Sequence, residues 1–230
     1  MFFYNFNYFI FMAPAIILML VAQWYVNSAY KKWSRIRNQR NITGKDAVDR
    51  LIRTARLYDV EVERVAGRLS DHYDPRTKIL RLSQSVSDTP SVASLAIAAH
   101  ELGHAQQDKE GYMPLKFRAA LVPMVNIGSY LGWILIFAGL FFNYLNLAWL
   151  GVAFFSGGAF FALTTLPVEL NASARARQML TDSGLITDPN EERGVRNVLN
   201  AAALTYIAAL VQAVLQLLYF VSLIGGRRRN

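Results

Sequence analysis

Three long stretches without a charged side chain constrain this chain more than any other feature. They cover residues 1–30, 119–168 and 197–226. A helix crosses the hydrocarbon core of a bilayer with about 20 apolar residues, so the first and last stretches each fit one crossing. The middle stretch fits two crossings that a short turn at residues 143–146 would join. The sequence therefore predicts an integral membrane protein, mainly α-helical, with about four transmembrane helices.

The remaining residues predict a small soluble α+β part. Apolar residues recur at helical spacing after Thr43, and the runs 60–65 and 79–82 alternate as strands of a hairpin or small sheet do. The turn between them is expected at residues 74–77. The predicted segments are an N-terminal transmembrane anchor (1–30), a soluble segment (31–118), a transmembrane hairpin (119–168), a helix with a linker (169–196) and a last transmembrane helix with a basic tail (197–230).

Two small features of the predicted spans are interpreted as packing devices. Gly157 and Gly158 in the third span are expected to permit close helix packing. Gln212 and Gln216 lie one turn apart in the last span and predict a polar contact with another helix. The spans contain no ionisable residue, which argues against a transporter or channel component.

The positive charge of the chain is concentrated beside the first span. The net charge is +8, and nine Lys and Arg residues lie in 31–56 against two acids, Asp46 and Asp49. Basic residues next to a span mark the cytoplasmic side, so the soluble part is predicted there. No basic stripe is interleaved with aromatic residues, and nucleic-acid binding is therefore not expected. A full fourth crossing would place residues 227–229, all arginines, on the outside, against this rule.

The residues that carry chemistry stand at 98–107, on a predicted helix that begins at Thr89 or Ser91 and ends by Gly111. The chain has no cysteine, so a metal site would need His, Asp or Glu ligands. His100 and His104 are four residues apart and share one helix face, where both imidazoles can bind one zinc ion. Glu101 is rotated by about 100° and stands beside such an ion, where a general base must be.

A coincidental match on a surface helix is the plain alternative to this interpretation. The chain has only three histidines, and two of them flank a glutamate at metal-binding spacing on an apolar helix. A third ligand must come from elsewhere, because Gln107 and Glu110 replace the glycine and third histidine of the extended motif. Glu169, Glu110 and His72 are candidates. Glu169 is preferred as the first charge after 119–168, although it would equally mark the end of the third span.

Several segments together resemble the YugP-like neutral zinc metallopeptidases of bacterial membranes. The chain is more distantly similar to membrane gluzincins of the HtpX and CAAX-protease type. The resemblance spans most of the chain, and it rests on the segments 99–106 (AHELGHAQ), 167–173 (PVELNAS), 73–77 (YDPRT), 81–83 (RLS) and 199–206 (LNAAALTY).

The resemblance implies a ligand set and some supporting residues. Because the distant relatives take their third ligand from a later helix, it implies Glu169 beside His100 and His104, with one Zn²⁺ per chain. Asn171 stands where the family often has an aspartate, so it could orient a metal-bound histidine only as a neutral partner. Candidates to stabilise the oxyanion of amide hydrolysis are Arg175, Tyr206 and His72.

A membrane-bound zinc endopeptidase follows as the expected function, with its site near the cytoplasmic interface of a bacterial plasma membrane. Its expected partners are the lipid bilayer and a peptide or membrane-protein substrate, whose backbone could pair with the strand at 79–82. That strand could equally serve only as core structure. Membrane-protein quality control or processing would suit this location. The alternative is a non-catalytic membrane scaffold or assembly factor that keeps zinc for structure.

Overall fold

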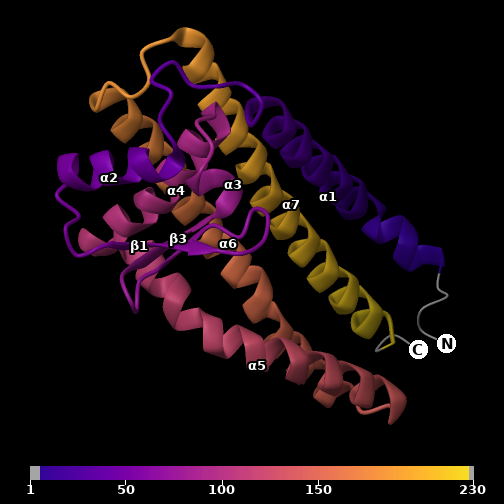
Figure 1. Ribbon diagram of the computed structural model, residues 1–230. Coiled ribbons are helices and arrows are strands. Elements are labelled where there is room, and N and C mark those ends of the chain that lie inside the picture. Colours follow the sequence, from indigo (N-terminus) through magenta and orange to yellow (C-terminus); the bar gives the residue numbers. More distant parts are fainter. Residues whose placement is uncertain (1–5, 228–230) are drawn as a thin grey trace. The chain divides into compact units, whose positions relative to one another are not determined.

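The structure, a computed structural model, describes residues 6–227 and is mainly helical (Figure 1). Its four long helices are each long and apolar enough to cross a membrane, which confirms the predicted membrane protein with four spans. The third of them continues through Pro167, so Glu169 lies on the same helix as the third span. The four helices are α1 (Phe6–Trp33), α5 (Met113–Phe141), α6 (Leu145–Asp182) and α7 (Pro189–Arg227). Arg228 and Arg229 lie outside the described residues.

The chain forms two compact units. Residues 6–22, 116–167 and 205–227 belong to the first, named here the apolar unit. Residues 23–115 and 168–204 belong to the second, named here the sheet unit. Each of the four long helices contributes residues to both units. The division into five consecutive segments stays a prediction.

Close packing in the apolar unit uses glycines other than the expected ones. A methyl group added at Gly151 would come within 2.6 Å of the Ile136 backbone nitrogen, and one at Gly132 within 2.9 Å of the Phe155 nitrogen. These glycines let the backbones of α5 and α6 approach each other. The expectation for Gly157 was wrong, because among residues 6–227 no atom beyond its local helix backbone lies within 4 Å of a methyl group added there. A methyl group added at Gly158 would make only an ordinary contact, 3.7 Å from the Ser129 hydroxyl.

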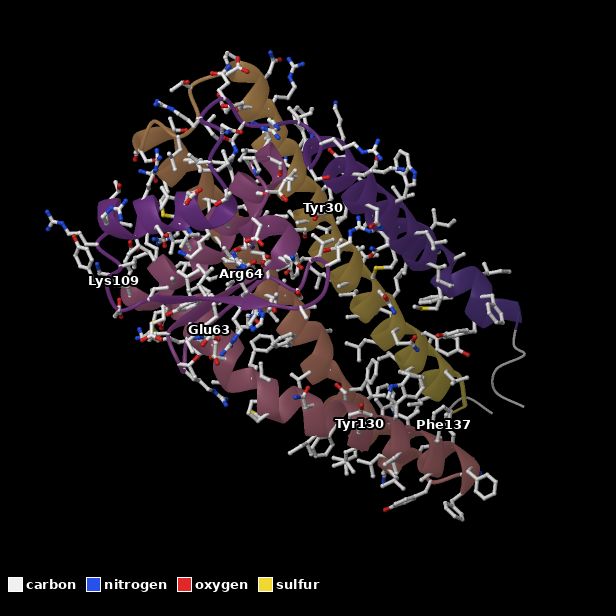
Figure 2. The ribbon with its side chains drawn as sticks, in the orientation of Figure 1. Tyr30, Glu63, Arg64, Lys109, Tyr130 and Phe137 are labelled. Atoms are coloured by element: carbon white, nitrogen blue, oxygen red, sulfur yellow. The ribbon has the colours of Figure 1, made fainter. Side chains whose placement is uncertain are left out.

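Aromatic side chains fill the space between helices in the apolar unit. Trp133 stacks on Phe137 of the same helix at 5.2 Å between ring centroids, and it meets Phe220 of α7 edge-on at 5.0 Å. Figure 2 labels Phe137 on α5. The predicted polar contact of the last span is confirmed for Gln216, whose side-chain oxygen accepts a hydrogen bond of 2.9 Å from the Tyr8 hydroxyl of α1.

A three-stranded sheet lies in the sheet unit. Its strands are β1 (Glu61–Val65), β2 (His72–Asp74) and β3 (Ile79–Ser83), in the order β1-β3-β2. The predicted turn joins β2 to β3 as an antiparallel hairpin, whereas β1 pairs with β3 in parallel. β2 was not predicted, because three residues are too short to show an alternating pattern.

The position of β3 corrects one expectation. This strand is central, with β1 along one edge and β2 along the other, so residues 79–81 have no free edge for a substrate backbone. Leu80 and Leu82 are fully buried, while Arg81 points to the other face and pairs at 3.0 Å with Glu63 of β1. Glu63 is labelled in Figure 2. The outer strands of the sheet are β1 and β2.

Three further helices complete the sheet unit: α2 (Gly44–Thr54), α3 (Gln84–Ser87) and α4 (Val92–Lys109). Thr43 and Asp46 form a capping box at the start of α2, and the Ser91 hydroxyl accepts from the Ser94 backbone N–H at the start of α4. These bonds satisfy backbone donors that have no partner within a helix. α4 packs against α2, α3 and the sheet, and its residues Leu95, Ala99 and Leu102 are fully buried.

Candidate metal centre

Helix α4 presents two imidazoles on one face. His100 and His104 are one turn apart, with ring centroids 4.9 Å from each other and planes nearly perpendicular. Both side chains are mostly buried, at 13% and 12% exposed. Glu101 follows His100 and is rotated from it by about 100°, so it stands beside this pair rather than within it.

Helix α6 adds a carboxylate to the pair. Glu169 Oε2 lies 3.2 Å from His100 Nε2 and 3.6 Å from His104 Nε2. The ligand atoms of these three residues all lie within 4.8 Å of one another. The structure thus brings together the three residues that the sequence singled out as metal ligands, from positions far apart in the chain.

Small residues allow α6 to approach α4 this closely. A methyl group added at Gly103, between the two histidines, would come within 2.6 Å of the Ala172 carbonyl oxygen. On α6, Ala172 and Ala176 are fully buried and share a helix face with Glu169. A larger side chain at any of these positions would separate the carboxylate from the imidazoles.

Hydrogen bonds at the second ring nitrogens orient both imidazoles. His100 Nδ1 lies 3.2 Å from the Ser173 hydroxyl, and His104 Nδ1 lies 3.0 Å from the side-chain oxygen of Gln107. Each ring therefore turns its Nε2 atom toward Glu169. Partners of this kind set the tautomer of metal-binding histidines and raise their basicity.

Gln107 and Ser173 were not among the residues predicted for the site. Gln107 follows His104 by three residues and Ser173 follows Glu169 by four, so each shares a helix face with a ligand. This spacing is the signal that could have identified them. The same spacing fits many helical residues that touch nothing, so only packing distinguishes these two.

The electrostatics favour a cation among these groups. Burial alone would lower the pKa of His104, but the hydrogen bond with Glu169 and the charges of Glu101 and Glu169 outweigh it and raise that pKa. The His104 ring thus takes up positive charge readily beside these two carboxylates. A divalent metal supplies such charge and displaces the proton on binding.

The donor set fits zinc. Zinc binds histidine nitrogens at about 2.0–2.1 Å and carboxylate oxygens at about 2.0–2.2 Å, so tetrahedral geometry puts neighbouring ligand atoms roughly 3.3 Å apart. The separations of 3.2 Å and 3.6 Å around Glu169 bracket this value. Two nitrogens and one oxygen also leave the fourth position for water, as catalytic zinc sites do.

Asn171 is linked to the ligand His104 through Gln107. Its side-chain oxygen accepts a 2.9 Å hydrogen bond from the Gln107 amide nitrogen and one of 2.7 Å from Arg175 Nε. Arg175 in turn forms an ion pair with Glu110 at 2.6 Å. Glu110, a candidate third ligand, is thus engaged elsewhere, and Arg175 is held by Asn171 and Glu110.

His72, another predicted site residue, lies apart from the ligand cluster. His72 is exposed on β2, and its Nδ1 bonds to the Ser70 carbonyl oxygen at 2.8 Å. It is not brought to the ligands, because β2 pairs with β3 and directs this ring toward solvent. Tyr206 belongs to the apolar unit, and its role stays a prediction.

A partly buried acid near Glu101 was also missed by sequence reasoning. Asp71 accepts hydrogen bonds from the backbone N–H and the hydroxyl of Ser83, at 2.7 Å and 3.1 Å. Burial raises the pKa of Asp71, these two bonds oppose the rise, and the negative charge of Glu101 adds to it. Nothing in the local sequence distinguishes Asp71 from the other acids of the chain.

Comparisons with known proteins find a family that is named for zinc. A family model described as "Putative neutral zinc metallopeptidase" matches residues 8–225. The chain is similar to the "Putative membrane protease YugP" of Bacillus subtilis (strain 168), with 42% identity over 224 residues that cover 96% of this chain and 99% of that protein. No solved structure matches the chain.

Proposed function

Because this chain belongs to the family of neutral zinc metallopeptidases, we propose that it is a membrane-bound endopeptidase that uses one zinc ion held by His100, His104 and Glu169. The observation that carries the proposal is the approach of Glu169 Oε2 to the Nε2 atoms of both histidines at 3.2 Å and 3.6 Å. A buried carboxylate facing two imidazoles has a high desolvation cost unless the group binds a cation. Zinc binding accounts for this arrangement.

Each ligand has a distinct part in the proposed site. Ser173 and Gln107 hold the imidazoles so that their Nε2 lone pairs face the metal position. Glu169 contributes the negative charge that partly neutralises a divalent ion, and it is only 2% exposed, so water does not compete for it. When bound, Zn²⁺ lowers the pKa of a coordinated water to about 7 and polarises the substrate carbonyl.

Glu101 is the proposed general base. Its place on α4, next to His100 but off the ligand face, lets its carboxylate reach the proton of the attacking water. Glu101 takes this proton, and the water oxygen bonds to the carbonyl carbon. The carbon–nitrogen bond then breaks, and Glu101 returns the proton to the departing amine nitrogen.

The position of Glu169 on α6 suggests where the site lies. This helix carries no charge from Leu145 to Val168, and Glu169 follows directly. At 1.5 Å rise per residue, the ligand stands within about one turn of the end of the apolar stretch. Together with the basic segment 31–56, this supports a site near the cytoplasmic interface and substrates that are associated with the membrane.

Replacing Glu101 separates the enzyme from a zinc-binding scaffold. The purified Glu101→Gln variant should retain zinc by metal analysis and lose peptide cleavage, because the amide accepts no proton. Glu61→Gln, on the exposed edge of β1, is the matched control and should cleave like the wild type. Cleavage by Glu101→Gln at the wild-type rate would contradict the proposed mechanism, and a wild type that binds zinc without cleaving any membrane-associated peptide would favour the scaffold.

A further inference from the structure

We infer that Gln107 is a positioning residue, which fixes the ring orientation of His104 and ties it to the helix that carries Glu169. The inference rests on the proposed zinc site and deepens it. Gln107 is fully buried at the contact of α4 with α6, although a buried amide is costly unless all its groups are bonded. Its neighbours determine which way its amide faces.

The orientation of the Gln107 amide follows first from the contact between Arg175 and Asn171. A guanidinium only donates hydrogen bonds, so the Asn171 atom that lies 2.7 Å from Arg175 Nε must be the side-chain oxygen. This oxygen also lies 2.9 Å from the end of the Gln107 side chain. An oxygen can only accept, so the Gln107 atom facing it is the amide nitrogen.

A second hydrogen-bond acceptor independently requires the same orientation of the Gln107 amide. The Val168 carbonyl oxygen, next to Glu169 on α6, lies 2.8 Å from the same atom of Gln107. The two hydrogens of the amide nitrogen therefore go to Asn171 and Val168, and the amide oxygen is left for His104. This oxygen accepts from His104 Nδ1 at 3.0 Å, so that nitrogen carries a hydrogen.

The consequence is a fixed role for each nitrogen of His104. With a hydrogen on Nδ1, the lone pair that can bind a metal is on Nε2, the atom that faces Glu169 at 3.6 Å. The same amide holds the backbone of α6 one residue before the third ligand. Gln107 thus sets both the direction of one ligand and the position of another.

The role of Arg175 follows from this chain of bonds. Its guanidinium holds the Asn171 amide and is itself held by Glu110, which is about half exposed. The side chain is therefore an orienting group for the Gln107 and His104 pair. The Asn171 oxygen provides the acceptor that this orientation requires.

Zinc affinity tests the inference on the full-length protein in detergent micelles. Gln107→Leu should bind zinc about 10- to 100-fold more weakly than the wild type, which is the usual cost of losing a partner of a metal-binding histidine. Gln107→Glu keeps the acceptor for His104 but loses both donors, to the Val168 carbonyl and to Asn171, so it should bind zinc more weakly than the wild type and more tightly than Gln107→Leu. Gln84→Leu, the same substitution at an exposed position of α3, is the matched control and should bind normally.

Nuclear magnetic resonance of the zinc-loaded wild type tests it without any substitution. The chain has three histidines, so a ring-¹⁵N-labelled sample gives three sets of signals. The inference requires a His104 ring with a protonated Nδ1 and a metal-bound Nε2. A His104 ring bound through Nδ1, or unchanged zinc affinity of Gln107→Leu, would overturn the inference alone. A wild type that binds no zinc would overturn the proposed function as well.

Discussion

Gly103 on α4 and Ala172 on α6 are in backbone contact: a methyl group added to Gly103 would come within 2.6 Å of the Ala172 carbonyl oxygen. Gly103 lies between the two histidines and Ala172 lies three residues after Glu169. The separation of these two helices therefore sets the separation of the carboxylate from the imidazoles.

Gly103→Ala is expected to push α6 away from α4. Overpacking of this kind costs about 1–3 kcal/mol of stability, and the displaced Glu169 should weaken zinc binding. Thermal unfolding and zinc titration in detergent measure both effects. Gly157→Ala is the control, since among residues 6–227 a methyl group there meets no atom beyond its local helix backbone within 4 Å. It should leave zinc binding unchanged and should not lower the unfolding temperature. Normal zinc binding by Gly103→Ala would contradict the importance of this contact.

Glu169→Ala should lose zinc. Removing the carboxylate leaves two ligands, and zinc sites require three protein ligands with an open position or four without one. Metal analysis of the purified variant measures the loss. Glu110→Ala tests the other acidic candidate: Glu110 pairs with Arg175 outside the ligand cluster, so this variant should keep zinc, with at most a weaker affinity through the loss of the Arg175 contact. Zinc retained by Glu169→Ala would mean that another group is the third ligand.

The capping box of α2 predicts a pH-dependent stability. The Thr43 hydroxyl and backbone N–H lower the pKa of Asp46 from its ordinary value of 3.8. The charged carboxylate therefore stabilises the fold above that value, and this contribution is lost as the pH falls through the lower pKa of the folded state. Thr43→Ala should cost about 0.5–2 kcal/mol at neutral pH.

Thermal unfolding of Thr43→Ala across pH values checks this prediction. The difference from the wild type should shrink toward acid pH, where Asp46 is protonated in both proteins. Thr54→Ala, at the other end of the same helix, should show a smaller and pH-independent change. A deficit that is equally large in acid would exclude a contribution from the bond between the Thr43 hydroxyl and the Asp46 carboxylate, because the bond from the Asp46 backbone N–H does not titrate.

The hydrogen bond between Tyr8 and Gln216 predicts that removing both of its partners costs less stability than removing one. Among residues 6–227, the buried Gln216 side-chain nitrogen has no hydrogen-bond partner, although its oxygen accepts from Tyr8. Tyr8→Phe leaves that oxygen unpaired too and should cost about 1–3 kcal/mol. Tyr8→Phe with Gln216→Leu removes every unpaired group and should unfold no lower than the wild type in a thermal scan. A double variant less stable than Tyr8→Phe would refute this reasoning.

Single cysteines can test the predicted topology, because the natural chain contains none. Tyr58 and Phe142 are 72% and 73% exposed, and they lie in the soluble part and at the hairpin turn. With the basic segment 31–56 inside the cell, a membrane-impermeant maleimide should label Phe142→Cys and spare Tyr58→Cys in intact cells. Labelling of both sites after lysis is the control. The reverse pattern in intact cells would invert the topology.

Features that depend on neighbouring residues were readable from the sequence. Uncharged runs predict spans because each residue contributes its own free energy of transfer into lipid. His100 and His104 share a face because helix geometry places residues four apart together. The cap at Thr43 and the turn between β2 and β3 are equally local.

Features that depend on contacts between distant segments could not be read from the sequence. The sequence did not distinguish the interhelical glycines Gly132 and Gly151 from Gly157, because all three are small residues in apolar helices. It also did not show that β3 is central, since the pairing order of strands depends on their partners. The edge available to a substrate was misassigned for that reason.

For the candidate site, the sequence by itself determined a pair of imidazoles with a glutamate beside them, because one helix turn sets their geometry. Only the tertiary structure decided that Glu169 meets them, that Ser173 and Gln107 orient the two rings, and that Arg175 belongs to a chain of hydrogen bonds ending at His104. The physical reason is that these contacts require α6 to lie against α4. That approach depends on the absence of a side chain at Gly103 and on packing along both helices, which no local pattern encodes.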